Sequence, residues 1–467
     1  MRSARAAHHN RPELPASQQM TSTAASSLAA GSTTSIAAAA IGHSLPSLFR
    51  LAPDQRGDQP GRVSQALDAG RSRHYPLLAM VPPPSRPALP ALTSLRFLAA
   101  AAIVWLHVGG VWNIPVGRGI NLGFGVSFFF VLSGFILTYR YDELRARIEI
   151  IRFLRARVAR IWPAHIAALA LVVATMTDVF STFPVYHHLV PVLISNTLIV
   201  QAWLPFDITA VSLNGPSWSI STEFAFYLMF PWLSRNLYRT WHYKLALAVG
   251  VAISIDIFCR LLDLNTSNGG WTALTAFPLS RMPEFVLGMC AALVWRNLDQ
   301  RPKRLGLWAA TAIETAAIGL LALTILSPSP LLSHVNLGTA WPIGFGIPAL
   351  AAAILILAMA GTGGLFSRAL AARPFVFLGE ISYSVYLLHA GIAVIILTYL
   401  PELHSSPLRD AAGSAVYVSA VLFSSTAMWL FIECPARRLI VSGRLRPAKT
   451  PAPEGPASSA ERPAVAL

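Results

Sequence analysis

The sequence predicts an all-α, polytopic integral membrane protein. Of its 467 residues, 54% are hydrophobic and 12% are charged, and the mean hydropathy is +0.54. A soluble domain carries about 25% charged residues. After residue 90, apolar runs of roughly 20 residues repeat along the chain, which is the length that a helix needs to cross a bilayer.

Residues 1–90 precede the first apolar run and differ from the rest in composition. They contain nine Arg, no Lys and four acidic residues, with an Ala/Ser/Thr tract at 21–40 and a Pro-rich stretch at 82–90. No window is apolar and long enough to span a bilayer or to form the core of a signal peptide. We expect a disordered, dispensable cytoplasmic tail, or a start of translation at Met80. The Arg-rich, acid-poor composition also resembles a transit peptide.

Ten apolar runs are long enough to be transmembrane helices. They cover 92–112, 120–139, 162–180, 216–234, 244–262, 276–296, 306–327, 341–361, 375–399 and 411–433. The run 189–204 is short and contains Pro191 and Asn196, which favours an interfacial or re-entrant helix. The membrane domain is therefore expected over 91–440, and 441–467 as a second disordered tail.

The distribution of basic residues supports this count. With a cytoplasmic amino terminus, seven, three, four and two Lys or Arg fall in the inner loops 140–160, 235–244, 296–304 and 362–374. The outer loops hold Arg118, Arg260 and Arg409. This asymmetry follows the positive-inside rule, and counting 189–204 as a full span would destroy it. We therefore expect both termini in the cytoplasm, and we attribute the net charge of +15 to topology, with no nucleic acid as a partner.

The sequence contains no signal for a metal or for a permanently bound cofactor. Cys259, Cys290 and Cys434 are scattered in mostly apolar surroundings, so they form no disulfide framework and no metal-ligand spacing. The nucleophile elbow, the P-loop and the HExxH motif are also missing from the sequence.

Arg96 and His107 lie in the first apolar run. Their separation of eleven residues is just over three helical turns, so both side chains face nearly the same direction, about 16 Å apart along the axis at ~1.5 Å per residue. Arg96 could snorkel to the interface and His107 could be a polar contact between helices. We favour a functional pair facing a polar channel, with His107 near mid-depth as a proton acceptor.

The densest basic cluster lies in the inner loop 140–160. Topology and attraction to anionic membrane lipids explain part of it. Arg157 and Arg160 are three residues apart, so they share one face of a helix and can grip a phosphorylated donor such as coenzyme A, with Arg155 as a further contact.

Acidic residues occur at the start of two spans. Glu223 lies about two turns into the segment that begins near Pro216, where it either pairs with a cation or acts on a proton or a hydroxyl group. Arg281 and Glu284 are three residues apart and are expected to form an internal ion pair.

Two other segments carry polar residues within apolar runs. In the second span, Gly125, Ser133 and Gly134 allow another helix to approach closely, which indicates either packing alone or a narrow wall beside the His107 helix. In the ninth span, Ser382, Tyr386 and His389 can share one face. From the residues alone, the chain is a membrane protein with a buried polar path and a cytosolic anion site.

Together these segments resemble the acyltransferase 3 family of integral-membrane acyltransferases. The matching residues are Leu95-Arg96 to His107, the FFFVLSGF segment 128–135, Arg157-x-x-Arg160-Ile161-Trp162-Pro163, Trp218-Ser219 to Glu223 with Phe226-Tyr227, Arg281-Met282-Pro283-Glu284-Phe285, and Ser382-Tyr383 to His389. They occur in the family's order and cover about 92–440. Each motif alone is weak, whereas the ordered set is specific.

The resemblance implies a bacterial inner-membrane O-acyltransferase. Members move an acyl group, usually acetyl, from cytosolic acyl-CoA to a hydroxyl of a carbohydrate acceptor such as lipopolysaccharide O-antigen, exopolysaccharide, an oligosaccharide or a macrolide sugar. It implies that Arg96 and His107 are the essential pair and that Arg157 and Arg160 bind acyl-CoA. Glu223 is expected to orient His107 or the acceptor.

The resemblance also has limits. Some relatives carry an extracytoplasmic SGNH-type domain, and this chain is expected to work without one or to pass the acyl group to a separate partner. Ser127 stands where relatives often have an acidic residue, and Phe224-Ala225 replace a common Glu-Gln pair. Both departures concern the choice of acceptor.

Two other classes of function would use a membrane domain of this kind. A glycan or lipid-linked glycan flippase would also use buried Arg, His and Glu residues, but it often shows inverted repeats, and the sequence has none. A non-catalytic scaffold would not need so many intramembrane ionisable groups.

Overall fold

The computed structural model describes most of the membrane domain. The described residues are 86–109, 120–175, 189–205, 208–264, 270–299, 305–326, 345–400 and 407–442. They contain helices and loops but no strand, which confirms the all-α class. Almost all of both expected tails lies outside the described residues, as do Met80 and Arg118.

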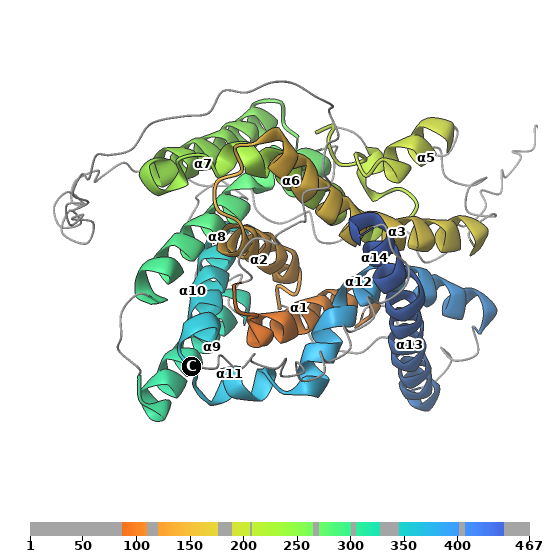
Figure 1. Ribbon diagram of the computed structural model, residues 1–467. Coiled ribbons are helices and arrows are strands. Elements are labelled where there is room, and N and C mark those ends of the chain that lie inside the picture. The colour runs from red at the N-terminus through yellow and green to blue at the C-terminus, as the bar shows by residue number, and fades with distance from the viewer. Residues whose placement is uncertain are drawn as a thin grey trace, which may run out of the picture. The chain divides into compact units, whose positions relative to one another are not determined.

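The long helices correspond to the predicted apolar runs (Figure 1). They are α1 (Pro90–Gly109), α2 (Phe124–Arg140), α3 (Arg147–Thr175), α6 (Trp218–Leu233), α7 (Leu237–Leu261), α8 (Pro278–Asp299), α9 (Leu307–Leu326), α10 (Ile347–Gly361), α12 (Arg373–Tyr399) and α13 (Pro407–Met428). Three shorter helices are α5 (Leu189–Thr197), α11 (Leu365–Leu370) and α14 (Cys434–Ser442). π-Helical turns occupy Thr272–Ala276 and Trp429–Glu433.

Six segments among the described residues are long and apolar enough to cross a membrane. They are Pro90–His107, Arg147–Thr175, Thr272–Leu298, Leu307–Leu326, Arg373–Tyr399 and Arg409–Val441. Helices α2 and α10 are apolar but shorter. The chain is an integral membrane protein, and the count of ten spans stays a prediction. Helix α5 has nine residues, too few to span a bilayer alone.

The basic cluster is helical, which differs from the expected inner loop over 140–160. Helix α3 begins at Arg147 because Glu149 caps its first turn, accepting the backbone N–H groups of Arg145 (3.1 Å) and Ala146 (3.0 Å). The α2–α3 connection is therefore only residues 141–146. Arg157 and Arg160 thus stand on a rigid helix.

The structure describes helix α1 up to Gly109, and residues 110–112 of the predicted run lie outside the described residues. His107 is close to the carboxyl end of the described helix, and its depth in the membrane stays a prediction.

Two pairs of helices cross with their backbones in contact. In Figure 1, α1 and α2 lie inside a ring that includes α3, α6, α8, α10 and α12. A Cβ atom added at Gly134 of α2 would lie 2.0 Å from the carbonyl oxygen of Phe285 in α8. One added at Gly379 of α12 would lie 2.0 Å from the carbonyl oxygen of Thr93 in α1. Only glycine permits these crossings.

A buried carboxylate fixes the connection between α10 and α12. Glu314, in the apolar helix α9, accepts the backbone N–H groups of Gly364 (2.8 Å) and Phe366 (2.9 Å) at the start of α11. At the other end of α11, the carbonyl of Leu370 accepts a hydrogen bond from Ser94 of α1 (2.5 Å). Helix α11 therefore ties α9 to α1 and sets where α12 begins.

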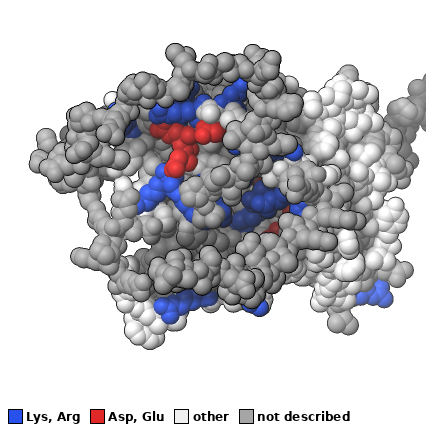
Figure 2. Space-filling model, viewed as in Figure 1, with Lys and Arg blue, Asp and Glu red and all other residues white. Residues whose placement is uncertain are grey.

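Lys and Arg side chains gather on the face shown in Figure 2, beside a smaller group of acidic residues. Asp142, in the α2–α3 connection, pairs with Arg86 (2.9 Å) and Arg296 (3.2 Å). Glu143 accepts the backbone N–H of Asn236 (2.9 Å), and the hydrogen bond from Arg145 lowers its pKa. These contacts join α2–α3 to the chain before α1, to α8 and to the α6–α7 turn.

We predict that Gly134→Ala destabilises the protein by about 1–3 kcal/mol, because the added methyl group overpacks the α2–α8 crossing. Thermal unfolding of the purified protein in detergent measures this. The control is Gly319→Ala in α9, where an added Cβ meets no atom within 4 Å. Equal thermal midpoints for the two variants would contradict the account.

Candidate active site

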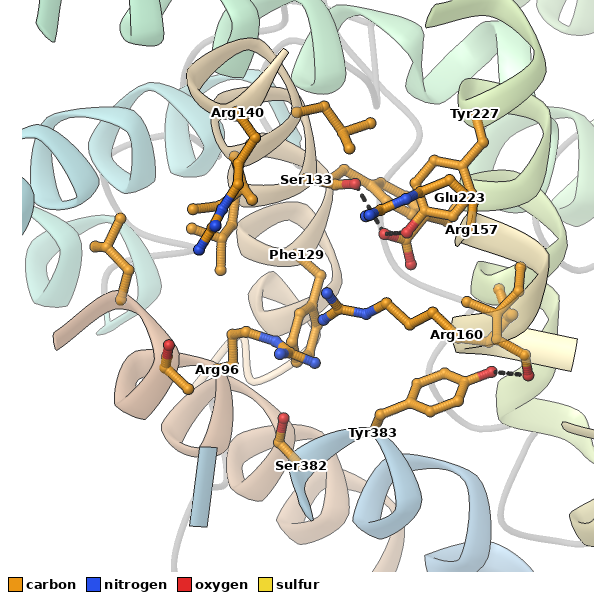
Figure 3. Close-up of a pocket in the computed structure, with 18 of the residues that line it drawn as sticks. Arg96, Phe129, Ser133, Arg140, Arg157, Arg160, Glu223, Tyr227, Ser382 and Tyr383 are labelled. Atoms are coloured by element: carbon orange, nitrogen blue, oxygen red, sulfur yellow. Dashed lines mark hydrogen bonds between the residues drawn. The ribbon is translucent and has the colours of Figure 1, made fainter. Parts of the chain in front are cut away.

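Five arginines line one cavity of about 370 Å³ between α1, α2, α3, α6, α12 and α14. They are Arg96, Arg140, Arg157, Arg160 and Arg437. In Figure 3, Arg96 and Arg160 extend into the cavity from α1 and α3, and Phe129 of α2 also lines it. Arg96, Arg157 and Arg160 are partly buried, and Arg140 and Arg437 are exposed. Five guanidinium groups around one cavity are suited to an anion.

Arg157 is fixed by aromatic rings. Its guanidinium lies 5.8 Å from the ring centroids of Tyr141 and Phe153 and 5.9 Å from that of Tyr227. Its Nη2 donates a long hydrogen bond to the Tyr141 hydroxyl (3.4 Å). Its Nε is buried and has no hydrogen-bond partner among the described residues. A buried donor of this kind is available to a ligand.

Arg155 lies outside the cavity lining, unlike Arg157 and Arg160. It is exposed and donates to the carbonyl of Ile440 in α14. Positions two apart on a helix do not share a face, which separates Arg155 from its neighbours. The structure thus brings together two of the three arginines that the sequence grouped.

Glu223 lines the cavity from α6 and is bound by hydroxyl groups. Ser133 of α2 donates to its Oε1 (2.8 Å), and so does Tyr227 (2.6 Å), as Figure 3 shows. Among the described residues no cation lies within ion-pair distance of Glu223. The two hydroxyl groups are thus the side-chain hydrogen-bond partners of Glu223 in the described part of the chain.

Helix α12 forms another wall of the cavity. The hydroxyl of Tyr383 donates to the carbonyl of Ile161 in α3 (2.8 Å), which holds α12 against the arginine helix. The hydroxyl of Tyr386 donates to the carbonyl of Pro216 (2.8 Å) and is 2.6 Å from Ser219 Oγ. Ser219 and Tyr386 line the cavity together.

His107 lies outside the cavity lining and contacts a second histidine. Its Nδ1 is 3.3 Å from Nε2 of His389, and the ring centroids are 5.1 Å apart. His389 is fully buried, whereas His107 is exposed in the described structure. The ring of Tyr386 lies 5.8 Å from that of His389. Tyr386 therefore borders both the arginine cavity and the histidine pair.

Arg281 and Glu284 form the expected ion pair, away from the cavity lining. Two hydrogen bonds join them (2.6 and 2.9 Å), and the two side chains are 1% and 0% exposed. Arg281 also donates to Ser127 of α2 (3.1 Å), and its guanidinium lies 5.9 Å from the ring centroid of Trp218. Arg281, Glu284 and Trp218 thus connect α8, α2 and α6.

The sequence analysis missed Arg140 and Arg437 as cavity residues. Arg140 directly follows the predicted span 120–139, and Arg437 follows the one that ends at 433. The positive-inside rule explained Arg140, and Arg437 lay outside the counted loops, so neither indicated a ligand. A smaller cavity of about 170 Å³ shares Arg96, Arg160 and Arg437 with the larger one.

The fold and this site define an integral membrane protein with an arginine-lined cavity and a histidine pair near it. The acyltransferase domain model of the acyltransferase 3 family matches residues 89–433, and the chain belongs to this family. It is therefore a membrane acyltransferase.

Two relatives illustrate the similarity. The chain is 30% identical to the acyltransferase MdmB of Streptomyces mycarofaciens over 405 residues, which cover 79% of this chain and 96% of MdmB. It is 23% identical to the O-acetyltransferase OatA of Staphylococcus aureus over 369 residues, 75% of this chain but 57% of OatA. The chain thus spans little more than half of OatA. No solved structure matches the chain.

We predict that Arg281→Met costs about 3–5 kcal/mol of stability, because it leaves a buried, unpaired carboxylate at Glu284. The double variant Arg281→Met/Glu284→Leu should recover much of this loss. Thermal unfolding in detergent compares the two. If the double variant is no more stable than the single one, the ion pair does not have this structural role.

Proposed function

We propose that this chain transfers an acyl group, most simply acetyl, from cytosolic acyl-CoA to a hydroxyl group of a carbohydrate acceptor. The arginine cavity carries the proposal, because coenzyme A is a multiply phosphorylated donor. Acyl transfer follows from the family, and the name of OatA supports acetyl transfer to oxygen. The protein would work in a bacterial inner membrane with both termini in the cytoplasm.

Arg157 and Arg160 would hold the phosphates of the donor. Arg157 is pre-oriented by three rings and keeps a buried Nε–H without a partner in the described chain. Arg96, on the opposite side of the cavity, would balance further negative charge. Since the sequence places His107 about 16 Å further along α1 at ~1.5 Å per residue, the long pantetheine arm would bridge the two places.

The thioester would reach His107 by passing the wall made by Phe129, Ser219 and Tyr386. His107 then takes the proton from the acceptor hydroxyl while the oxygen attacks the thioester carbon. The C–O bond forms, the C–S bond breaks, and the proton passes to the departing thiolate of coenzyme A. A covalent acyl-histidine would split the same transfer into two steps. Glu223 faces the donor cavity, so it would orient the donor arm or the acceptor.

The acceptor would be a cell-surface polysaccharide, a lipopolysaccharide O-antigen, an oligosaccharide or a glycosylated metabolite. Membrane lipids surround the domain, and a separate extracytoplasmic partner would receive the acyl group if the transfer has a second stage. Mass spectrometry of surface glycans from a deletion strain identifies the acceptor.

We predict that Arg157→Ala weakens acetyl-CoA binding about 10- to 100-fold, as expected for the loss of hydrogen bonds to a charged group. Binding of labelled acetyl-CoA to purified protein measures this. Arg155→Ala is the matched control, because Arg155 lies two residues away but outside the cavity lining, and it should stay within about twofold. Equal affinities of the two variants would refute the assigned donor site.

We predict that His107→Ala abolishes acyl transfer while protein level, membrane insertion and acetyl-CoA affinity stay normal, because His107 lies outside the donor cavity. Transfer of labelled acetyl groups to a glycan acceptor measures the activity. Wild-type-like transfer by this variant would exclude the proposed role. A wild-type protein that moves glycan across vesicles but never acylates it would instead indicate a flippase.

A further inference from the structure

The hydrogen bonds of His389 define its tautomer. Its Nδ1 is 2.7 Å from the carbonyl oxygen of Tyr386, and its side chain is 0% exposed. A carbonyl oxygen only accepts, so Nδ1 carries the hydrogen in the neutral ring. The lone pair of His389 is therefore on Nε2, which faces His107.

The same reasoning defines the tautomer of His107. Its Nδ1 lies 2.9 Å from the carbonyl oxygen of Ile103 and 3.3 Å from Nε2 of His389. Both partners are acceptors, so Nδ1 of His107 carries a hydrogen that the two share. The lone pair of His107 is left on Nε2, on a side chain that is exposed in the described structure.

The relative position of the two rings is fixed by the helices that carry them. Helices α1 and α12 are in backbone contact, since a Cβ added at Gly379 would lie 2.0 Å from the carbonyl oxygen of Thr93. In addition, the hydroxyl of Tyr417 in α13 donates to the backbone carbonyl of His389 (3.2 Å). His389 thus cannot move away from His107 without moving α12.

We propose that His389 is a positioning residue for His107, an inference that rests on the proposed function. Together with the carbonyl of Ile103, it accepts the Nδ1–H of His107 and holds the ring so that Nε2 is the reacting nitrogen. When Nε2 takes the proton of the acceptor hydroxyl, His107 becomes an imidazolium, and the lone pair of His389 stabilises that charge. The proton then leaves with the thiolate of coenzyme A, and His389 keeps its own hydrogen throughout.

His165 is a comparison for a purely structural histidine. It is also fully buried and bonded to a backbone carbonyl, through Nε2 to Asn196 (2.8 Å). Among the described contacts it has none with His107, and it does not line the arginine cavity. Loss of either buried ring perturbs packing, but only loss of His389 removes the acceptor that faces His107.

The test compares His389→Gln and His389→Leu with the same two substitutions at His165. The amide oxygen of Gln can accept the Nδ1–H of His107, whereas Leu cannot.

We expect kcat to fall about 100-fold in His389→Leu, within the contribution of a positioned general base, and less than about tenfold in His389→Gln. Acetyl-CoA affinity should stay unchanged in both, and the His165 variants should keep kcat within about threefold per folded protein. Equal losses for Gln and Leu at His389, or an equal loss at His165, would overturn the proposal.

A second measurement is independent of the reaction. Nitrogen-15 NMR of histidine-labelled protein, with His107→Ala to assign the signal, reports which ring nitrogen of His107 carries the hydrogen. The proposal expects hydrogen on Nδ1 in the wild type, and a shifted Nδ1 signal of His107 in His389→Leu, where the carbonyl of Ile103 is the remaining acceptor. Hydrogen on Nε2 in the wild type would overturn it. If the wild type transfers no acyl group but gives the expected tautomers, the proposed function fails while the hydrogen bond between the rings stands.

Discussion

The close crossing of α1 and α12 is the contact on which both parts of the site depend. Gly379 lets the two backbones touch at Thr93, three residues before Arg96. Further along α12, Tyr383 lines the cavity and His389 contacts His107 of α1. Ser94 and α11 pin the start of α12 to α1, so the spacing between the arginine cavity and the histidine pair is set by rigid helices.

The charges of the lining residues determine which ligands the cavity can bind. Five arginines line it, and Glu223, the carboxylate in its lining, is bound by the hydroxyl groups of Ser133 and Tyr227. By contrast, Arg281 is matched by Glu284 and packs as a structural pair. Ser127, at the position where relatives often carry an acid, also accepts a hydrogen bond from Arg281. The cavity thus carries an excess of positive charge, which a phosphorylated ligand would neutralise.

Sequence reasoning found the helices and most of the polar residues, because hydropathy and spacing are local signals. It placed Arg157 and Arg160 on one face and expected the Arg281–Glu284 pair. Contacts that depend on tertiary packing could not be predicted from these local signals. Arg155 contacts α14 instead of the cavity, and His107 lies outside the cavity lining. Arg140 and Arg437 joined the cavity because α2 and α14 meet the other helices there. The contact between His107 and His389 joins residues 282 positions apart, and no local pattern encodes it.

The central claim is that the arginine cavity holds the phosphates of acyl-CoA while the acyl group reaches the histidine pair beyond Tyr386. A cryo-electron microscopy map of the protein with a non-hydrolysable acetyl-CoA analogue tests it most directly. The account predicts phosphate density within hydrogen-bond distance of Arg157 and Arg160, with the pantetheine arm running past Tyr386 toward His107. Nucleotide density elsewhere on the protein, with the cavity empty, would contradict it.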